Sequence, residues 1–175
     1  MKYLLSILAI AITLSAQSQS ALTIRKEKLR QLGFLIGKWN VEAERTNSKG
    51  EVSVEKDAII SFAYDMDSTA IRNERHFRNN TFYEFIFYNT SRNMFEFIPL
   101  EYGIAAAPRP WMVDINKKIY QYKFSSFDAE KKITIETTVT LRQINPDKLI
   151  ETFEGIAFET GEKAYHSKLT YTRLQ

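Results

Sequence analysis

The chain has 175 residues, of which 44% are hydrophobic and 26% are charged, as is usual for one globular domain. The formal net charge is +3 and no run of five like charges occurs, so the charge pattern gives no sign of a nucleic-acid partner. The sequence contains no cysteine, which excludes disulfides, thiol nucleophiles and cysteine metal sites.

Residues 1–20 have the order of regions found in a secretory signal. A lysine precedes an apolar run from Tyr3 to Leu14, and small and polar residues follow. We expect cleavage after Ser18, or as a second choice after Ser20. The alternative is an uncleaved membrane anchor, for which the apolar run is short. The mature protein, residues 21–175, is then periplasmic or secreted, without stable membrane insertion.

Residues 21–35 are expected to form one short helix. Thr23 is a candidate N-cap, and basic residues fill the face that we expect to be solvated. The opposite face is apolar and consists of Ile24, Leu29, Leu32 and Leu35.

From Trp39 onward the hydrophobic residues alternate with a period of two, which is typical of strands that are buried on one face. Turn residues separate the alternating segments and there is no βαβ rhythm. The pattern predicts one all-β domain, an antiparallel up-and-down barrel of 8–10 strands with one short N-terminal helix. The nine expected strands are 39–46, 52–64, 69–78, 82–88, 94–102, 118–124, 132–141, 148–158 and 165–174.

The segment 103–112 breaks this alternation. Pro108 and Pro110 argue against a central strand position, so we expect a long connecting loop. As an alternative, the segment is a flap over the barrel mouth in which Ile104, Trp111 and Met112 touch a ligand.

Two candidate functional residues lie on opposite faces of the expected strand 69–78. Arg75 shares the face of Ile71 and Phe77 and is expected to point inward with Asn73, whereas His76 is expected to face solvent. A buried arginine needs a carboxylate, either from the protein or from a ligand. Arg75 is therefore either an anchor for an anionic ligand or part of an internal ion pair.

No catalytic motif is present. The sequence lacks the glycine-rich nucleotide motifs, the nucleophile elbow and a histidine-rich metal motif. Asp65 and Asp67 are interpreted as turn residues rather than calcium ligands. We expect the protein not to be an enzyme. An enzyme that uses Arg75 and a facing carboxylate remains an alternative.

The stretch FLIGKWNVEAE, with Gly37 and Trp39 at the start of the first strand, resembles the opening of lipocalin-like proteins of the calycin superfamily, above all exported bacterial ones. The resemblance implies an antiparallel barrel in which the tryptophan packs at the closed end, with an interior cavity for a small apolar molecule. Gly37 lets the chain bend close to Trp39, whose large side chain then forms the floor.

The chain also resembles, more weakly, the nitrobindin-type haem barrels. Those proteins continue the motif with further glycines, where this chain has Val41. Their haem-binding histidine implies a corresponding role for His166, but strand parity directs His166 to solvent unless a bulge intervenes.

The sequence therefore predicts an exported barrel that binds a small hydrophobic or amphipathic molecule, without a metal or an obligatory cofactor. The alternatives are a haem-binding barrel that uses His166 and a ligand-free structural or interaction barrel of the cell envelope. Val41 and Phe62 are expected to line the interior as well. The predicted ligand-binding residues are Trp39, Tyr64, Arg75, Trp111, Tyr120, Tyr122 and Phe124.

Overall fold

A computed structural model describes residues 20–77, 80–101 and 104–175 of the chain, with the backbone alone described at 101, 104 and 105. The signal sequence predicted for residues 1–20 lies almost wholly outside the described residues. None of the helices in the described ranges is long and apolar enough to cross a membrane. The strands are β1 (Gly37–Asn47), β2 (Val52–Asp65), β3 (Ala70–Phe77), β4 (Asn80–Asn89), β5 (Met94–Glu101), β6 (Ile104–Ala105), β7 (Arg109–Asp114), β8 (Ile119–Asp128), β9 (Ile133–Asn145), β10 (Lys148–Ala157) and β11 (Lys163–Arg173).

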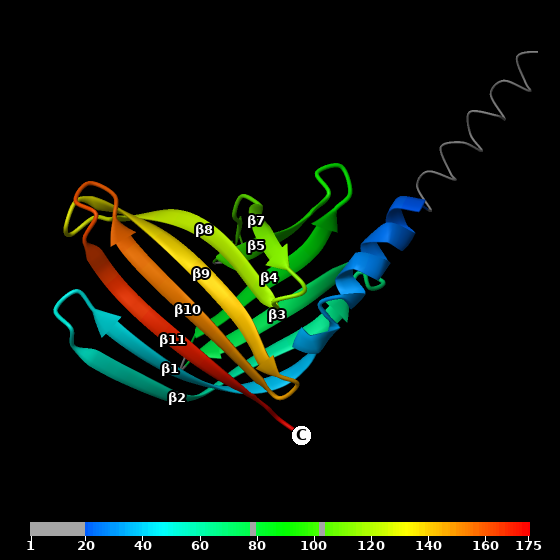
Figure 1. The fold of residues 1–175 in the computed structure, drawn as a ribbon, viewed down its shortest axis with the longest axis horizontal. Coiled ribbons are helices and arrows are strands. Elements are labelled where there is room, and N and C mark those ends of the chain that lie inside the picture. The colour runs from blue at the N-terminus through cyan, green and yellow to red at the C-terminus, as the bar shows by residue number, and fades with distance from the viewer. Residues whose placement is uncertain (1–19, 78–79, 102–103) are drawn as a thin grey trace, which may run out of the picture.

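The strands form one antiparallel barrel of ten strands, with the two-residue β6 paired only to β5 (Figure 1). Around the barrel the neighbouring strands are, in order, β4, β3, β2, β1, β11, β10, β9, β8, β7 and β5. The first strand, β1, therefore pairs with both β2 and β11. The pairing of β4 with β5 closes the ring, so no long edge is left exposed. The predicted fold class is confirmed.

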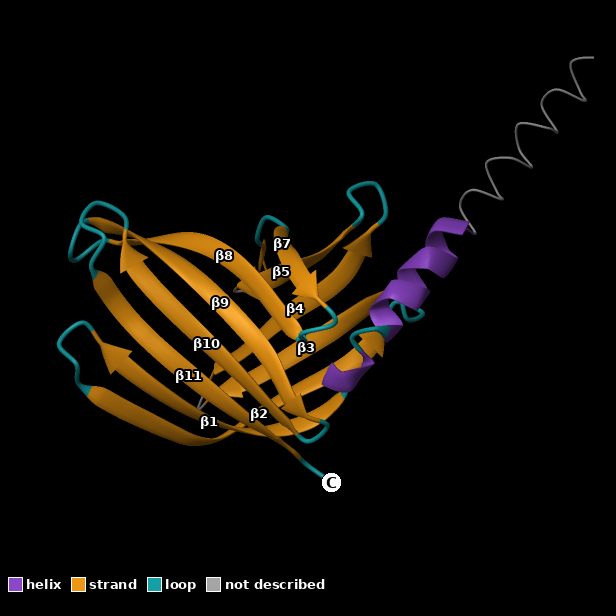
Figure 2. Cartoon of the chain, in the orientation of Figure 1, coloured by secondary structure: helices purple, strands orange, loops and turns teal. Residues whose placement is uncertain are grey.

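The N-terminal helix covers residues 20–30 and leads through the 3-10 helix η1 (Gly33–Leu35) into β1 at one end of the barrel (Figure 2). Three leucines of the predicted apolar face, Leu29, Leu32 and Leu35, are fully buried. Ile24 is 40% exposed, so the helix packs through its C-terminal half only. The N-cap prediction for Thr23 was wrong, because Thr23 lies inside the helix.

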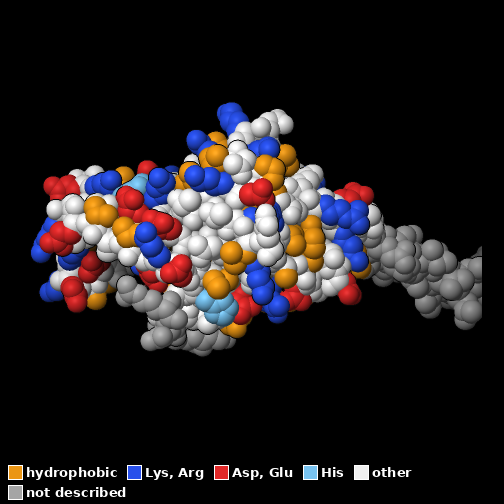
Figure 3. All heavy atoms as spheres, turned by 90° about the horizontal axis from the view of Figure 1, so that it is seen from below, with side chains coloured by type: hydrophobic (Ala, Val, Ile, Leu, Met, Phe, Trp, Pro, Cys, Tyr) orange, Lys and Arg blue, Asp and Glu red, His pale blue; other side chains and the backbone are white. Residues whose placement is uncertain are grey.

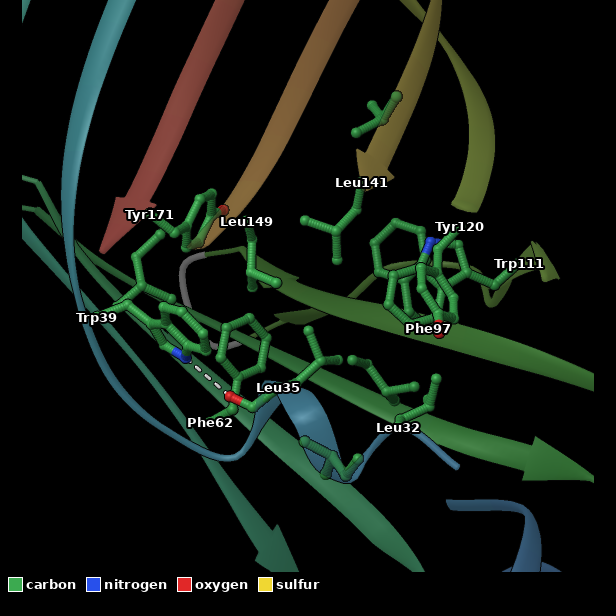
Figure 4. Close-up of a cluster of buried hydrophobic side chains, with 14 of the residues drawn as sticks. Leu32, Leu35, Trp39, Phe62, Phe97, Trp111, Tyr120, Leu141, Leu149 and Tyr171 are labelled. Carbon is green, nitrogen blue, oxygen red and sulfur yellow. Dashed lines mark hydrogen bonds between the residues drawn. The ribbon is translucent and has the colours of Figure 1, made fainter. Parts of the chain in front are cut away.

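The side chain of Trp39 closes the barrel interior at the end next to η1. Its ring is fully buried, and its indole nitrogen donates a hydrogen bond of 2.8 Å to the carbonyl oxygen of Leu35 (Figure 4). The bond joins β1 to η1 and leaves no buried indole donor unpaired at this position. Around Trp39 the core is filled by leucines and aromatic rings, as Figure 4 shows.

A β-bulge changes the inward face of β2. Val41 pairs with Ala58, but Ala43 pairs with Glu55, and Asp57 between them has a positive φ of 64°. The extra residue reverses the side-chain parity for the first part of β2. Val52 and Val54 have the same sequence parity as Phe62, yet they are 60% and 50% exposed, whereas Glu55 is buried.

The segment 103–112 is not a long loop, because it contributes β6 and the barrel strand β7. Pro110 pairs with Glu96 of β5, whereas the pairing of β7 with β8 begins only at Met112. Around Pro110 the strand thus has one neighbour rather than two, which is the position where a strand tolerates proline. The prediction of a connecting loop was wrong for this reason.

The surface seen in Figure 3 carries acidic and basic side chains interspersed with single apolar ones. On this face no large area of one charge sign is formed.

Candidate functional site

The barrel interior is divided into a filled end and a hollow end. The end next to η1 is packed with Trp39, Tyr120 and the leucines of the core. Toward the opposite end lies a cavity of about 440 Å³, called here the mouth pocket, within the size range of small-molecule sites. Its lining consists of Arg45, Glu55, Arg75, Phe77, Asn80, Phe82, Phe153, Tyr165, Ser167 and Leu169.

The mouth pocket combines aromatic walls with a polar rim. Phe77, Phe82 and Phe153 provide apolar surface from β3, β4 and β10. At the rim, Arg45 Nη1 donates to Glu55 Oε2 at 2.9 Å. This mixture of apolar walls and a few polar groups suits a small amphipathic molecule.

Tyr165 forms one wall because of a glycine opposite it. A Cβ atom at Gly155 would lie 2.4 Å from Tyr165 Cε1, so the ring passes directly over the glycine backbone. In this position the Tyr165 hydroxyl hydrogen-bonds Thr137 Oγ1 on β9 at 2.6 Å. Gly155 thus fixes where this part of the pocket wall lies.

Arg75 separates the mouth pocket from the filled end. Its side chain is 12% exposed; Nε donates to Glu84 Oε2 at 3.0 Å, and Nη1 donates to Glu151 Oε2 at 3.0 Å. Burial by itself would lower the pKa of Arg75, but the adjacent carboxylates of Glu151 and Glu84 outweigh it and hold the pKa well above its ordinary value. The buried arginine is therefore a charged member of an internal ion-pair cluster.

Two further side chains complete this cluster. Tyr171 donates its hydroxyl hydrogen to Glu151, and Asn73 Nδ2 donates to Glu84 Oε2 at 2.6 Å. Burial raises the pKa of Tyr171 well above its ordinary value, so the hydroxyl keeps its proton and remains a donor. One guanidinium thus faces two carboxylates, each with an additional donor, which satisfies the buried charges inside the protein.

The cluster borders a second, much smaller void. This inner void measures about 20 Å³, and its lining includes Glu84 and Glu151. Neither carboxylate lines the mouth pocket. The acids that face Arg75 therefore have room for a water molecule but not for a substrate.

A third arginine, Arg109, also points inward. It pairs with Phe97 on β5, and its guanidinium lies over the rings of Phe97 and Phe124, with Cζ 5.6 and 4.6 Å from their centroids. Among the side chains that the structure describes, it has no carboxylate partner. Stacking covers the faces of a guanidinium and leaves the N–H groups at its edge able to donate.

The structure brings together only part of the predicted ligand site. Arg75 is the one predicted residue that lines the mouth pocket; Trp111 and Tyr122 line the inner void with it, and Trp39 and Tyr120 lie in the filled core. Phe124 lies beneath Arg109.

Tyr64 does not lie in the interior, because it is 39% exposed. Phe62 already pairs with Gly37, the first residue of β1, so Tyr64 extends past the end of the barrel toward Gly33. In the flap alternative Met112 touches a ligand, but Met112 is 55% exposed on the outer face, and the side chain of Ile104 lies outside the described part.

Both histidines point away from the interior, as strand parity predicted. His76 is 46% exposed and contacts Glu74, with 2.9 Å between Nε2 and Oε1. His166 alternates with Tyr165 and Ser167, which line the mouth pocket, so its ring is directed outward. An interior haem would have no ligand from His166.

Most of the pocket lining was missed from the sequence. Arg45 continues the inward series of Trp39, Val41 and Ala43, and Phe153 shares the face of Glu151, so period-two reading alone identifies both. Glu55 carried no such signal, because the bulge at Asp57 decides its direction.

No family model matches the sequence, and no curated protein matches it. Among solved structures, the S-type phycobiliprotein lyase from Guillardia theta is similar, with a TM-score of 0.53 and 11% identity over 86% of this chain and 93% of that one. A DUF3598-family protein of unknown function from Nostoc punctiforme has a TM-score of 0.42 and 11% identity over 81% of this chain. This chain spans about half of its length, 48%.

These likenesses concern the fold. The likeness to the phycobiliprotein lyase and the closed ring of ten antiparallel strands agree on the fold, a lipocalin-like β-barrel.

Proposed function

We propose that the protein binds a small amphipathic molecule in the mouth pocket, without catalysing a reaction. The observation that carries the proposal is a cavity of about 440 Å³ with aromatic walls, toward the end of the barrel opposite η1. Four rings, those of Phe77, Phe82, Phe153 and Tyr165, give apolar contact, and the polar rim remains at the solvent side. Similarity in fold to a phycobiliprotein lyase supports a ligand-binding role in general.

Arg109 is the proposed contact for an acidic group of the ligand, in place of Arg75. The charge of Arg75 is already balanced by Glu84 and Glu151, whereas Arg109 has no carboxylate partner among the described residues. Phe124 and Phe97 hold its guanidinium on the inner face of β7. Arg109 does not itself line the mouth pocket, but Phe124 pairs with Thr137, whose side chain hydrogen-bonds the lining residue Tyr165.

Binding is tested by displacing an environment-sensitive fluorophore with dodecanoate, dodecanol and dodecylamine. In the S167W variant a large ring fills the pocket, and we expect at least a tenfold loss of affinity. The matched control is K168W, which places the same ring on the exposed outer face of the same strand and is expected to bind normally. R109Q is expected to weaken dodecanoate selectively.

Two outcomes would change these conclusions. If no amphipathic molecule binds, or if S167W binds as well as K168W, the mouth pocket is not the site and a filled structural barrel is the better description. If these molecules bind but R109Q changes the affinity for dodecanoate and for dodecanol equally, the mouth pocket remains the binding site. Arg109 then does not contact the acidic group.

We also propose that the protein acts outside the cytoplasm. The support is the order of charged, apolar and small residues in residues 1–20. Cell fractionation and N-terminal sequencing of the mature protein test it. An export signal predicts a first residue of Gln19 or Ala21, and an intact Met1 in the cytoplasmic fraction would contradict it.

A further inference from the structure

Two residues that line the inner void each have a buried polar atom without a protein partner. Asn73 is 1% exposed, and while its amide nitrogen donates to Glu84, its Oδ1 atom is buried without a protein partner. Trp111 is 8% exposed, and its Nε1–H is likewise buried without a partner. Both residues line the same void of about 20 Å³.

Leaving these two groups unpaired would be expensive. A buried polar group without a hydrogen bond loses its contacts with water on folding and gains nothing in exchange. The Asn73 amide cannot turn to avoid the problem without breaking its 2.6 Å bond to Glu84. The cost therefore stays in the folded state unless something enters the void.

The two groups select the chemistry of the occupant. One atom must accept a hydrogen bond from the indole and donate one to the amide oxygen. A hydroxyl-type oxygen does both, whereas a carboxylate only accepts and an ammonium only donates. A cavity of about 10–15 Å³ or more is large enough for one water.

We propose that the inner void is a binding site for one water molecule, which accepts from Trp111 Nε1 and donates to Asn73 Oδ1. The water extends the ion-pair cluster to β7: Trp111, water, Asn73, Glu84 and Arg75 form one continuous chain of hydrogen bonds. It fixes the orientation of the Asn73 amide and, through it, the position of Glu84. This site is independent of the ligand proposed for the mouth pocket.

The test uses the two tryptophans of the chain as target and internal control. In ¹⁵N-labelled protein without added ligand, we expect a water-selective NOE of the sign of a long-lived water at the Trp111 indole proton. Trp39, whose indole is bonded to Leu35, is expected to show none. The W111F variant assigns the two signals.

Three variants make the result specific. Y122F and Y171F remove the hydroxyls of two tyrosines that line the void. Exchange relayed through a tyrosine hydroxyl would be lost in these variants, whereas an NOE from a bound water should persist in both. N73L keeps the side-chain shape but removes the acceptor, and should abolish it. The absence of the NOE at Trp111, its loss in either tyrosine variant, or an equal NOE at Trp39 would overturn the proposal. The wild-type comparison of Trp111 with Trp39 stands even if N73L does not fold.

Discussion

The guanidinium of Arg173 lies over the ring of Trp39, with Cζ 4.1 Å from the ring centroid, and so joins the last strand of the barrel to the first. The same group donates from Nη1 to the carbonyl oxygen of Ile36 at 2.7 Å and from Nη2 to that of Phe34 at 2.8 Å. A Cβ atom at Gly37 would lie 2.7 Å from Nη1. The contact explains why a glycine stands two residues before the tryptophan.

Replacing Gly37 by alanine should destabilise the protein by about 2 kcal/mol or more, because the residue combines a positive φ of 129° with the close approach of Arg173. Chemical denaturation measures this. In an R173A background the loss should be smaller, since the clash is gone and only the backbone strain remains. G50A is the control, because Gly50 also has a positive φ but no atom within 4 Å of an added Cβ. A G37A penalty no larger than that of G50A would contradict the explanation.

Replacing Arg75 by methionine should destabilise the protein by about 3–5 kcal/mol, because Glu84 and Glu151 are left as buried charges without their cation.

Urea denaturation of R75M at pH 7 measures this loss. R72M is the matched control, because Arg72 pairs with Asp65 at 3.7 Å on the surface and its loss should change stability by less than about 1 kcal/mol. Equal effects of R75M and R72M would show that the inner cluster does not depend on its cation.

Replacing Gly155 by alanine should displace the Tyr165 ring and break its hydrogen bond to Thr137. We expect a loss of about 1–3 kcal/mol, typical of overpacking, together with weaker binding in the mouth pocket. Thermal unfolding and the fluorophore assay measure the two effects. Y165F removes the hydrogen bond without moving the ring and should bind normally. If G155A is as harmful in a Y165A background as alone, the ring is not what it displaces.

Replacing Glu96 by glutamine should reduce the loss of stability that the protein shows as the pH falls. Burial by itself would raise the pKa of Glu96, but hydrogen bonds from Asn89 and Arg92 lower it below its usual 4.5. A carboxyl with a lowered folded-state pKa stabilises the protein above its unfolded pKa, and this contribution is lost as the pH falls through the folded value. Tm measured from pH 6 downward should therefore fall less steeply in E96Q than in wild type. E130Q, at an exposed position, should follow wild type.

Period-two patterning predicted the nine main strands because one face of nearly every strand is buried. It also placed Asn73 and Arg75 inside the barrel and both histidines outside. It was wrong at β2, where the positive φ of Asp57 reverses the face, and at β7, where Pro110 has a strand neighbour on one side only. Both errors come from backbone pairing, which a single strand's sequence does not contain.

The sequence by itself determined the fold, an antiparallel barrel that begins with a glycine and a tryptophan after a short helix. Only the tertiary structure decided which part of the interior is hollow. Arg75 meets Glu151, 76 residues later in the chain, and Tyr165 passes over Gly155 to reach Thr137. Such contacts depend on how side chains from distant strands pack together inside the barrel. Strand parity predicts which face a residue lies on, but it does not predict how much of the interior the neighbouring side chains fill.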